Sequence, residues 1–478
     1  MPKKILANLF LLLAINLLIK PFWILGIDRT VQNTVGNQAY GQYMVLFNLS
    51  VMLTMLLDFG INNYTSTFIA KHPQMLKKKF ATLFPLKLVF SAAYLVATFL
   101  LGLMYGMRGT PLMLLVLLSF NQVLTFFVLF FRSNISGLQW FRTDALLSVT
   151  DRGMMILFAG SLLLLAQGTF TITHFIMAQT VGYFVSFIIS FVILLKPLQG
   201  LSIRFNKLMM ISFVRKSLPY ALLALLMTVY MRADVLIMKK LLANGDEQNG
   251  IYGVANRLLE AANMLAALVA TMLLPLFANM IKAKQNLENI VKMAIILLVI
   301  PAVAVSAMAW FYNTDIMLLL SKTSPLQSAP VFKVVMISFV AMCVMYIFGT
   351  LLTANGNLSV LNKLAAIALL INIVLNLWLQ PKLGAQGAAI AITFTHGFIA
   401  LTNMYFAVRY LKLSIDFSFF IKVIITLLLT VLAAGICVSI KLPLAIATAI
   451  VMLAVILMLF VTRLLKINQL KQLLPSKA

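Results

Sequence analysis

LLALLMTVYMRADVLIMKKLL (residues 222–242) is an almost unbroken apolar run that contains Arg232 and Asp234. In a helix, about 20 apolar residues cross the roughly 30 Å hydrocarbon core of a bilayer. Helical residues two apart point to different sides of the helix, whereas residues three or four apart share a face. The two charges therefore do not pair within this helix, and we expect each to have a partner elsewhere in the protein.

The rest of the chain has the same apolar character. Hydrophobic residues make up 63% of it and charged residues 10%, and its mean hydropathy is +1.04. A soluble domain has about 25% charged residues, so the composition excludes a soluble globule. Segments of transmembrane length predict an all-α polytopic membrane protein with about fourteen transmembrane helices. These are expected at 5–27, 42–68, 80–105, 111–131, 145–166, 172–195, 217–240, 251–280, 289–312, 331–353, 358–380, 386–409, 418–440 and 443–465.

The first apolar segment, MPKKILANLFLLLAINLLIKPFW (1–23), begins with basic residues, as a signal peptide does. It lacks a small-x-small cleavage site and many apolar segments follow it, so we expect it to be retained as the first helix. Cys343 and Cys437 fall within expected helices, which argues against a disulfide framework. The three histidines are scattered without the spacing of metal ligands. The sequence therefore predicts no metal site.

The distribution of basic residues predicts the topology. A net charge of +26 would suggest nucleic-acid binding in a soluble protein. With the N-terminus taken as cytoplasmic, however, the inner loops carry about three times as many Lys and Arg residues as the outer loops. This bias is typical of multi-pass membrane proteins. We therefore expect both termini to lie in the cytoplasm and no nucleic acid to be bound.

A basic connector divides the chain. KPLQGLSIRFNKLMMISFVRK (196–216) is typical of an amphipathic segment on the inner membrane face. It separates two lobes of about six helices each, which are followed by a further pair of helices. The predicted parts are an N-terminal lobe (1–196), a cytoplasmic connector (197–216), a C-terminal lobe (217–412) and the C-terminal helices with a basic tail (413–478).

A weak repeat relates the two lobes. AYGQY (39–43) opens the second expected helix and GIYGVANR (250–257) opens the eighth, and their tyrosine–glycine pairs align. The same alignment places Lys20 opposite Arg232, so the first helix of each lobe carries a cation at an equivalent position. An even number of helices separates the copies, so they share one orientation in the membrane. Two similar lobes around a midplane cavity suit transport by alternating access.

Several of these stretches together resemble one known family. VGNQAYGQYMVLFNLSVMLTMLLDFGINN (35–63) resembles the start of Wzx-type polysaccharide-biosynthesis flippases, with the pattern G-x-x-x-Y-G, an apolar helix and D-x-G. RADVLIM (232–238) with GIYGVANRL (250–258) resembles the second-half pattern of this family. LLTANGN (351–357) and INIVLNLWLQPKLGAQGAAIA (371–391) resemble its later helices. These flippases belong to the multidrug/oligosaccharidyl-lipid/polysaccharide (MOP) exporter superfamily.

The resemblance implies a fold and a function. The fold would be the V-shaped two-lobe bundle of the MATE transporters. The function would be export of an undecaprenyl-pyrophosphate-linked oligosaccharide (an O-antigen, capsule or exopolysaccharide repeat unit) across the bacterial inner membrane, next to the polymerase and glycosyltransferases of the same pathway. The resemblance implies no enzymatic activity and no cofactor, and it leaves open coupling to protons or sodium ions. Superfamily relatives include the lipid II flippase and drug antiporters, and fold alone does not separate these activities.

Basic residues within apolar helices are the candidate substrate-binding groups. A charge at mid-helix costs about 2.5–3.5 kcal/mol on insertion scales. Arg232 and Lys20 are candidates for lining the cavity, because Arg and Lys both pair with phosphate oxygens. Arg257 matches the family's arginine in the eighth helix, although Glu260 at i+3 can neutralise it. Arg152 is the fourth candidate. The alternative for each is snorkelling to the interface or pairing with an acid.

The acids within these helices are candidates for ion coupling or for structure. Asp58, in LLDFGIN, either binds a coupling cation or caps a helix break at Gly60, and we favour the structural role. Asp234 is expected to bond a backbone group or a neighbouring helix. Asp151 either lines the cavity or pairs across helices, and Glu260 belongs to the same group of acids. Lys87 lies near the cytoplasmic end of its helix and is expected to snorkel.

Two other classes of function stay open. A MATE-like cation-coupled drug exporter would bind cations at cavity acids, whereas the small excess of basic residues within the spans favours an anionic substrate. A membrane glycan polymerase or ligase would need acids or histidines on an outer loop. The largest such loop, YNTDIMLLLSKTSPLQSAP (312–330), offers only Asp315. No nucleophile elbow, phosphate-cradling glycine loop or metal-binding motif is present. The sequence therefore predicts a transporter.

Overall fold

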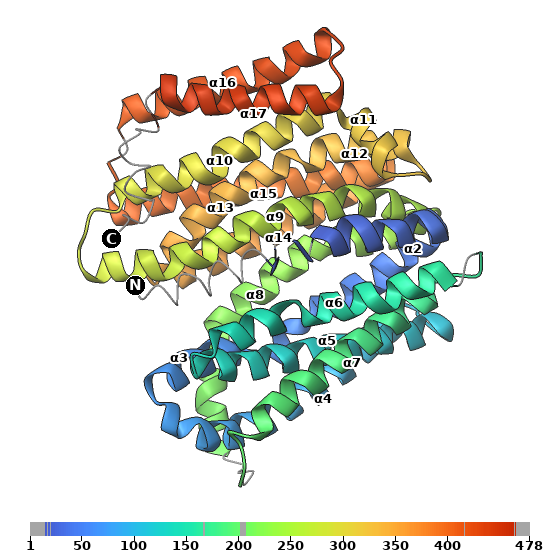
Figure 1. The fold of residues 1–478 in the computed structure, drawn as a ribbon, viewed down its shortest axis with the longest axis vertical. Coiled ribbons are helices and arrows are strands. Elements are labelled where there is room, and N and C mark those ends of the chain that lie inside the picture. Colours follow the sequence, from blue (N-terminus) through green and yellow to red (C-terminus); the bar gives the residue numbers. More distant parts are fainter. Residues whose placement is uncertain are drawn as a thin grey trace. The chain divides into compact units, whose positions relative to one another are not determined.

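The computed structural model describes residues 15–16, 18–19, 21–165, 168–200, 207–414, 416–462 and 464. These residues are almost entirely helical, and no strand occurs among them (Figure 1). Eleven of the described helical segments are long and apolar enough to cross a membrane. The all-α fold of a multi-pass membrane protein is therefore confirmed. The three further spans expected at 5–27, 42–68 and 251–280 are not among the eleven, and about half of the first lies outside the described residues.

The contacts divide the chain into two compact units, Met1–Gly250 and Ile251–Ala478. The first unit contains η1 (Trp23–Asp28), α2 (Arg29–Met52), η2 (Thr54–Leu57), α3 (Ile61–Lys71), η3 (Pro73–Met75), α4 (Leu76–Met104), α5 (Thr110–Gly137), α6 (Phe141–Leu165), α7 (Ile172–Leu195) and α8 (Lys207–Leu241). The boundary falls within α9 (Gly245–Lys282). Within this unit α5 packs against α3, α4 and α7, and α6 packs against α7.

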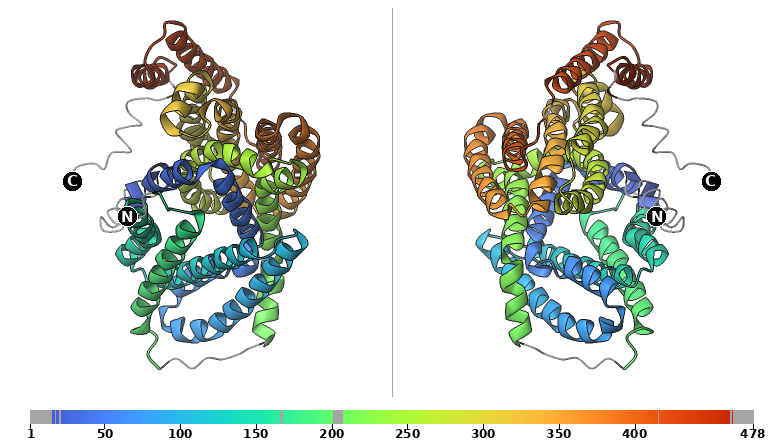
Figure 2. Two further views of the ribbon diagram at one scale, coloured as in Figure 1. Left: turned by 90° about the vertical axis from the view of Figure 1, so that its right-hand side faces the viewer. Right: turned by 90° about the vertical axis from the view of Figure 1, so that its left-hand side faces the viewer.

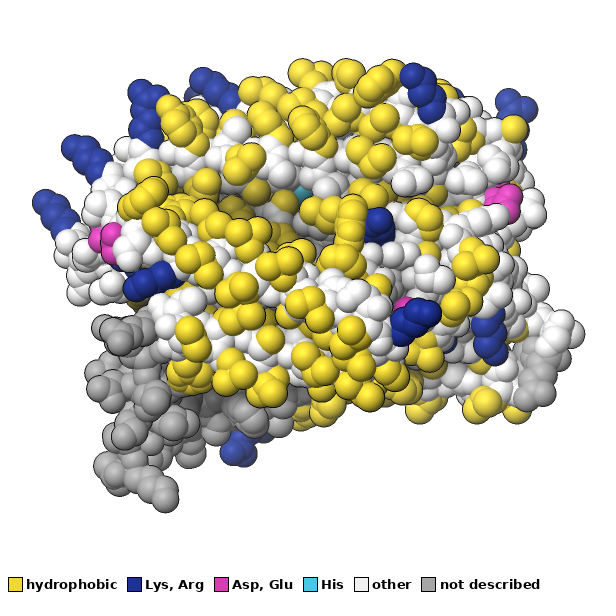
Figure 3. All heavy atoms as spheres, turned by 90° about the horizontal axis from the view of Figure 1, so that it is seen from above, with side chains coloured by type: hydrophobic (Ala, Val, Ile, Leu, Met, Phe, Trp, Pro, Cys, Tyr) yellow, Lys and Arg dark blue, Asp and Glu magenta, His cyan; other side chains and the backbone are white. Residues whose placement is uncertain are grey.

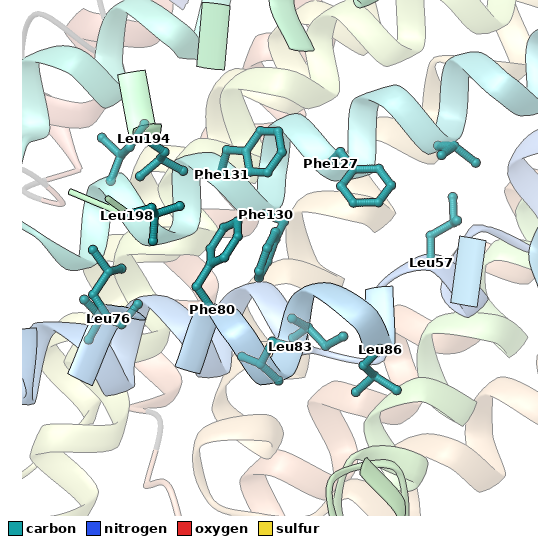
Figure 4. Close-up of a cluster of buried hydrophobic side chains, with 14 of the residues drawn as sticks. Leu57, Leu76, Phe80, Leu83, Leu86, Phe127, Phe130, Phe131, Leu194 and Leu198 are labelled. Carbon is teal, nitrogen blue, oxygen red and sulfur yellow. The ribbon is translucent and has the colours of Figure 1, made fainter. Parts of the chain in front are cut away.

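The core of the first unit is rich in phenylalanine. Phe80 on α4 stacks on Phe130 of α5 with 5.3 Å between ring centroids, and Phe127 and Phe131 extend the contact toward α7 (Figure 4). Each of these aromatic rings buries a large apolar surface area, which stabilises the packing of the helices. Offset ring pairs add further stabilisation. Dispersion contacts of this kind hold helices together where lipid supplies no hydrophobic drive.

One expected helix is broken in the structure. The sequence predicted a single helix at 42–68, but α2 spans Arg29–Met52 with a kink at Gly36, where φ is +82°. A short 3-10 turn follows, and Gly60 then adopts a left-handed conformation with φ +80° before α3 begins. Glycine lacks the Cβ atom that disfavours this conformation in other residues. The break therefore divides the predicted span at Gly60.

The connector and α8 also differ from the expectation. The sequence placed a connector at 197–216 and began the next helix at 217, whereas α8 is one 35-residue helix that begins at Lys207. Residues 201–206 lie outside the described residues. By contacts, α8 belongs to the first unit because it packs against α2, and the two helices lie side by side in both views of Figure 2. The two-lobe scheme itself stays a prediction.

The second unit begins within α9 and is also a helical bundle. It contains α10 (Glu288–Phe311), α11 (Asn313–Leu320), α12 (Pro325–Val335), α13 (Ile337–Ala354), α14 (Leu358–Leu383), α15 (Ala385–Leu411), α16 (Phe417–Ser439) and α17 (Leu444–Val461). Helix α15 packs against α13 and α14, and α16 packs against α10 and α17. The expected outer loop at 312–330 forms α11 and the start of α12, and Asp315 is exposed on it.

The outer faces of α16 and α17 carry exposed aliphatic side chains. Leu428, Leu432, Leu453 and Leu457 are each more than half exposed. Seen from the side on which Figure 1 shows these helices, hydrophobic side chains are spread over the whole face, and most of the basic side chains lie toward its margins (Figure 3). A hydrophobic surface of this extent is typical of lipid contact.

Candidate functional site

Arg232 lies near the middle of the membrane-spanning part of α8 and contacts α2. Its Nη1 donates a hydrogen bond to Asn48 Oδ1 at 3.1 Å, and its guanidinium carbon lies 6.0 Å from the Phe47 ring centroid. Asn48 is buried, and its own Nδ2 donates to the Met44 carbonyl at 2.7 Å. That bond fixes the amide so that its oxygen faces the arginine. The partly buried guanidinium is therefore held in one orientation.

Asp234 makes a hydrogen bond with the backbone of its own helix. Its side chain is almost completely buried, and its Oδ1 accepts a hydrogen bond from the Val235 backbone N–H at 2.8 Å. Arg232 instead contacts α2. The sequence left open a bond to a backbone group or to a neighbouring helix, and the observed contact of Asp234 is to the backbone of α8 itself. The role of Asp234 stays a prediction.

Arg152 on α6 lies between aromatic rings. Its guanidinium carbon is 5.8 Å from the Trp23 ring centroid and 5.9 Å from that of Tyr183. Its Nε lies 3.8 Å from Asp151 Oδ2, at the long end of an ion pair. Its Nη1 also donates to Met155 Sδ at 3.5 Å. The structure thus places Arg152 against η1 and α7, and Arg232 against α2.

The remaining predicted cations have separate environments. In the second unit, Arg257 Nη1 lies 2.7 Å from Glu260 Oε2, so the i,i+3 pair expected from the sequence is formed. Both side chains are less than one third exposed. Lys20 lies outside the described residues. Its predicted pairing with Arg232 across the repeat therefore stays a prediction.

Asp58 and Lys87 form an ion pair that the sequence did not predict. Lys87 Nζ lies 3.2 Å from Asp58 Oδ1, and the Lys87 side chain is 0% exposed. The prediction that Lys87 snorkels was therefore wrong, because its ammonium points into the bundle toward the helix break. The same Asp58 oxygen accepts from the Asn62 backbone N–H at 3.2 Å, so it caps α3 across Gly60. Structural contacts occupy this carboxylate.

The tyrosine–glycine motif permits close helix packing. Tyr40 donates from its hydroxyl to Asp28 Oδ2 at 2.8 Å, and both side chains are buried. A Cβ atom added at Gly41 would lie 1.7 Å from the Asp246 carbonyl oxygen, so only glycine fits. At Gly250 an added Cβ would lie 2.2 Å from the Asn37 carbonyl oxygen. The motif therefore has a packing role between α2 and the start of α9.

Sequence reasoning missed the neighbours that hold the arginines. Asn48, Trp23 and Tyr183 lie far from Arg232 or Arg152 in the sequence. The one available signal is that an asparagine inside an apolar helix needs a hydrogen-bond partner. Chemically, the arrangement presents guanidinium groups within a membrane-spanning bundle. Guanidinium donors match the oxygens of phosphate and carboxylate.

Solved structures share this fold. A multidrug resistance MATE family transporter of the MOP superfamily, in an inward-facing conformation, is similar with a TM-score of 0.66 and 13% identity, covering 82% of this chain and 94% of that chain. The lipid II flippase MurJ, in an inward closed conformation, has a TM-score of 0.62 and 15% identity, covering 89% and 97%. A MOP superfamily transporter from Pyrococcus furiosus has a TM-score of 0.59 and 12% identity, covering 85% and 94%.

These similarities establish the MOP-superfamily fold that the sequence predicted. At such low identity they show the fold alone. No curated protein matches the chain. The family described as polysaccharide biosynthesis protein matches residues 5–281, which include α2, α8 and both arginine environments of the first unit. Because this match covers more than half of the sequence, the chain belongs to the polysaccharide biosynthesis protein family.

Proposed function

We propose that the protein flips an undecaprenyl-pyrophosphate-linked oligosaccharide from the cytoplasmic to the outer leaflet of the bacterial inner membrane by alternating access. Membership of the polysaccharide biosynthesis protein family supports a glycan pathway. The MOP-superfamily fold supports movement of a substrate across the bilayer. In this proposal both termini are cytoplasmic, and the polymerase and glycosyltransferases of the pathway are partners.

The observation that carries the proposal is the position of Arg232. Placing a guanidinium near mid-span costs free energy, so a charge retained there is a candidate functional group. This one is oriented by a neutral amide and an aromatic ring. A pyrophosphate offers several anionic oxygens, which bind guanidinium through paired, charge-assisted hydrogen bonds. Arg152, with its guanidinium near two aromatic rings, is a second anion-binding candidate in the same unit.

The drug-exporter alternative has less support. A cationic drug would need available carboxylates within the membrane. Three of the four candidate acids, Asp58, Asp151 and Glu260, are each in an ion pair with a basic side chain. Substrate would have to displace an internal cation to reach any of them. An anionic substrate could instead bind to the basic residues, which slightly outnumber the acids within the expected spans. These ion pairs do not decide whether export is coupled to protons or to sodium ions, and the proposal leaves the coupling ion open.

Complementation of a flippase-null strain tests the proposed function. Arg232→Ala should abolish surface glycan at normal protein abundance, because the phosphate ligand is lost. Arg232→Lys should keep part of the activity, since the charge remains while the bidentate geometry is lost. Asp234→Asn should instead reduce protein abundance, because it replaces one acceptor oxygen of a buried carboxylate with an amide donor. Surface glycan and membrane-inserted protein are measured together.

Arg409→Ala is the matched control. Arg409 is exposed near the end of α15 and contacts the Tyr405 hydroxyl at 3.3 Å. Its loss removes one positive charge without touching the site, so export should be unchanged. Wild-type export by Arg232→Ala at wild-type abundance would refute the role of this arginine. Failure of the unmodified protein to restore glycan in strains that lack different glycan flippases, combined with increased drug resistance, would favour the exporter.

A further inference from the structure

A pocket of about 780 Å³ lies in the first unit, and neither Arg152 nor Arg232 is among its lining residues. It is lined by α2, by the turn between α4 and α5, and by the adjoining ends of α7, α8 and α9. Lys239 follows Arg232 by seven residues on α8, which corresponds to about 10 Å along the helix axis. The positive-inside bias predicts that this end faces the outer side of the membrane. The two lysines that line the pocket, Lys239 and Lys240, therefore lie about two helical turns from Arg232 along α8.

Three basic side chains line the exposed part of this pocket. Arg108, Lys239 and Lys240 are all exposed, and Asp246 is the one acid among the lining residues. Lys239 Nζ lies 2.5 Å from Asp246 Oδ2, so this acid is already paired. Lys240 Nζ lies 5.2 Å from the centroid of the Tyr105 ring. The charges at the opening are therefore positive in excess and favour an anion.

The deeper wall of the pocket is aliphatic. Leu46, Leu114 and Ile176 line it and are each less than 10% exposed. Tyr105 fixes one side, because its hydroxyl donates to the Leu236 carbonyl, and burial raises the pKa of this hydroxyl so that it remains a donor. A free inorganic anion would leave the aliphatic wall without a partner. A ligand with a hydrocarbon part attached to its anionic group uses both surfaces.

One side-chain oxygen of a pocket-lining residue has no hydrogen-bond partner among the described residues. This atom, Asp246 Oδ1, is buried, while Oδ2 binds Lys239. A buried carboxylate oxygen without a donor is costly, so a donor from a ligand or from water is expected there. The hydroxyl of a sugar or of glycerol supplies such a donor next to a phosphate. A hydroxyl-bearing phosphate headgroup therefore matches the basic groups and the acid together.

We propose that this pocket binds the hydroxyl-bearing phosphate headgroup of a membrane lipid, with Lys239 and Lys240 on the phosphate, Asp246 on a hydroxyl and the aliphatic wall on the hydrocarbon. Two lipids share this chemistry, namely bulk phosphatidylglycerol and a polyprenyl pyrophosphate that carries a sugar. The second would deepen the proposed function, because it would place a second lipid site where the exported molecule leaves. The lipid-binding inference itself does not depend on export.

Lipid titration of the full-length protein in detergent tests this proposal. The probes are phosphatidylglycerol, a polyprenyl pyrophosphate carrying one sugar, and inorganic phosphate, with bound lipid measured by native mass spectrometry. Lys239→Gln/Lys240→Gln should weaken lipid binding about tenfold, the equivalent of losing one charge-assisted contact. The control, Lys382→Gln/Lys441→Gln, removes two exposed charges outside the pocket and should change the affinity less than about twofold.

Each outcome of this titration has a defined meaning. Preferential binding of either lipid, lost in the pocket variant, supports the proposal and names the source of the headgroup. Equal affinity of the pocket variant and the wild type for both lipids overturns it. Inorganic phosphate that displaces the lipids at equal concentration also overturns it, since the hydrocarbon would then contribute nothing.

Protection of lysines provides a second measurement that needs no variant. Saturating lipid should slow acetylation of Lys239 and Lys240 in the wild-type protein, while Lys382 and Lys441 keep their rates. Equal protection of all four lysines would show a nonspecific lipid coat and would contradict the site. Both measurements are independent of glycan export. A failed complementation therefore refutes the proposed function without affecting this inference, and the reverse also holds.

Discussion

Lys87 Nζ lies 3.2 Å from Asp58 Oδ1 inside the first unit, and the lysine side chain is completely buried. Its ammonium also lies 5.6 Å and 5.8 Å from the ring centroids of Phe126 and Phe130. The pair joins α4 to the helix break at Gly60. Burial of an ion pair costs hydration free energy for both charges. The pair is therefore stabilising when compared with a buried charge that has lost its partner.

Removal of one partner of this pair should destabilise the protein. Lys87→Ala leaves the Asp58 carboxylate without its cation, and we expect a loss of about 3–5 kcal/mol, seen as a lower apparent melting temperature in detergent. The double variant Lys87→Met/Asp58→Asn removes both charges and should recover most of this loss. Thermal stability followed by size-exclusion fluorescence measures all variants. Additive losses in the double variant would show that the two side chains are not coupled.

Glycine at position 41 should be required for packing. Gly41→Ala places a Cβ atom 1.7 Å from the Asp246 carbonyl oxygen, so a helix must move. Overpacking of this kind costs about 1–3 kcal/mol or more. Gly153→Ala on α6 is the matched control, because an added Cβ there meets nothing within 4 Å. We expect low abundance for Gly41→Ala and normal or raised stability for Gly153→Ala. Equal abundance of the two variants would contradict the close approach of α2 and α9.

The topology can be tested with introduced cysteines. Cys343 and Cys437 are both buried, so the background labelling by a membrane-impermeant thiol reagent should be low. Lys441→Cys lies in the turn between α16 and α17, and Lys284→Cys lies in the turn between α9 and α10. The charge bias predicts labelling of intact spheroplasts at Lys441→Cys and not at Lys284→Cys. The reverse pattern would show that the predicted orientation is inverted.

Local sequence patterns predicted the elements that depend on local physics. Eleven of the expected spans coincide with described helices that are long and apolar enough to cross a membrane, because the thickness of the bilayer sets the length and hydropathy of such helices. The Arg257–Glu260 pair was predictable because i,i+3 neighbours meet on any helix. The break at Gly60 was foreseen as an option for Asp58, whereas the early start of α2 at Arg29 was missed.

Contacts between distant segments were not predictable in this way. Lys87 was expected to snorkel because its position along α4 lies near the inner interface, but that position does not reveal the neighbouring carboxylate. Asn48 and Arg232 are separated by 184 residues, and no periodic pattern links them. The sequence does not show that α2 packs on α8. It therefore identified Arg232 as the cation of the candidate site, but it did not identify Asn48 as the residue that orients it.

The Asn48–Arg232 hydrogen bond leads to the last prediction. If Arg232 exchanges the amide oxygen for pyrophosphate during transport, the strength of its resting contact controls the exchange. Asn48→Asp is nearly isosteric and places a carboxylate where the amide oxygen lies 3.1 Å from the guanidinium. A charge-assisted bond is about twice as strong as a neutral one, so the arginine should remain bound to the aspartate.

We therefore expect Asn48→Asp to reduce glycan export at least about tenfold at normal abundance, the effect of about 1.4 kcal/mol. Asn48→Ala should reduce export less, because it frees the guanidinium but removes its orientation. Surface glycan per inserted protein, measured in the flippase-null strain, compares the two variants. An order in which Asn48→Asp exports better than Asn48→Ala would mean that a fixed arginine suffices. Arg232 would then be a structural contact between α8 and α2, and the anion would have to bind elsewhere.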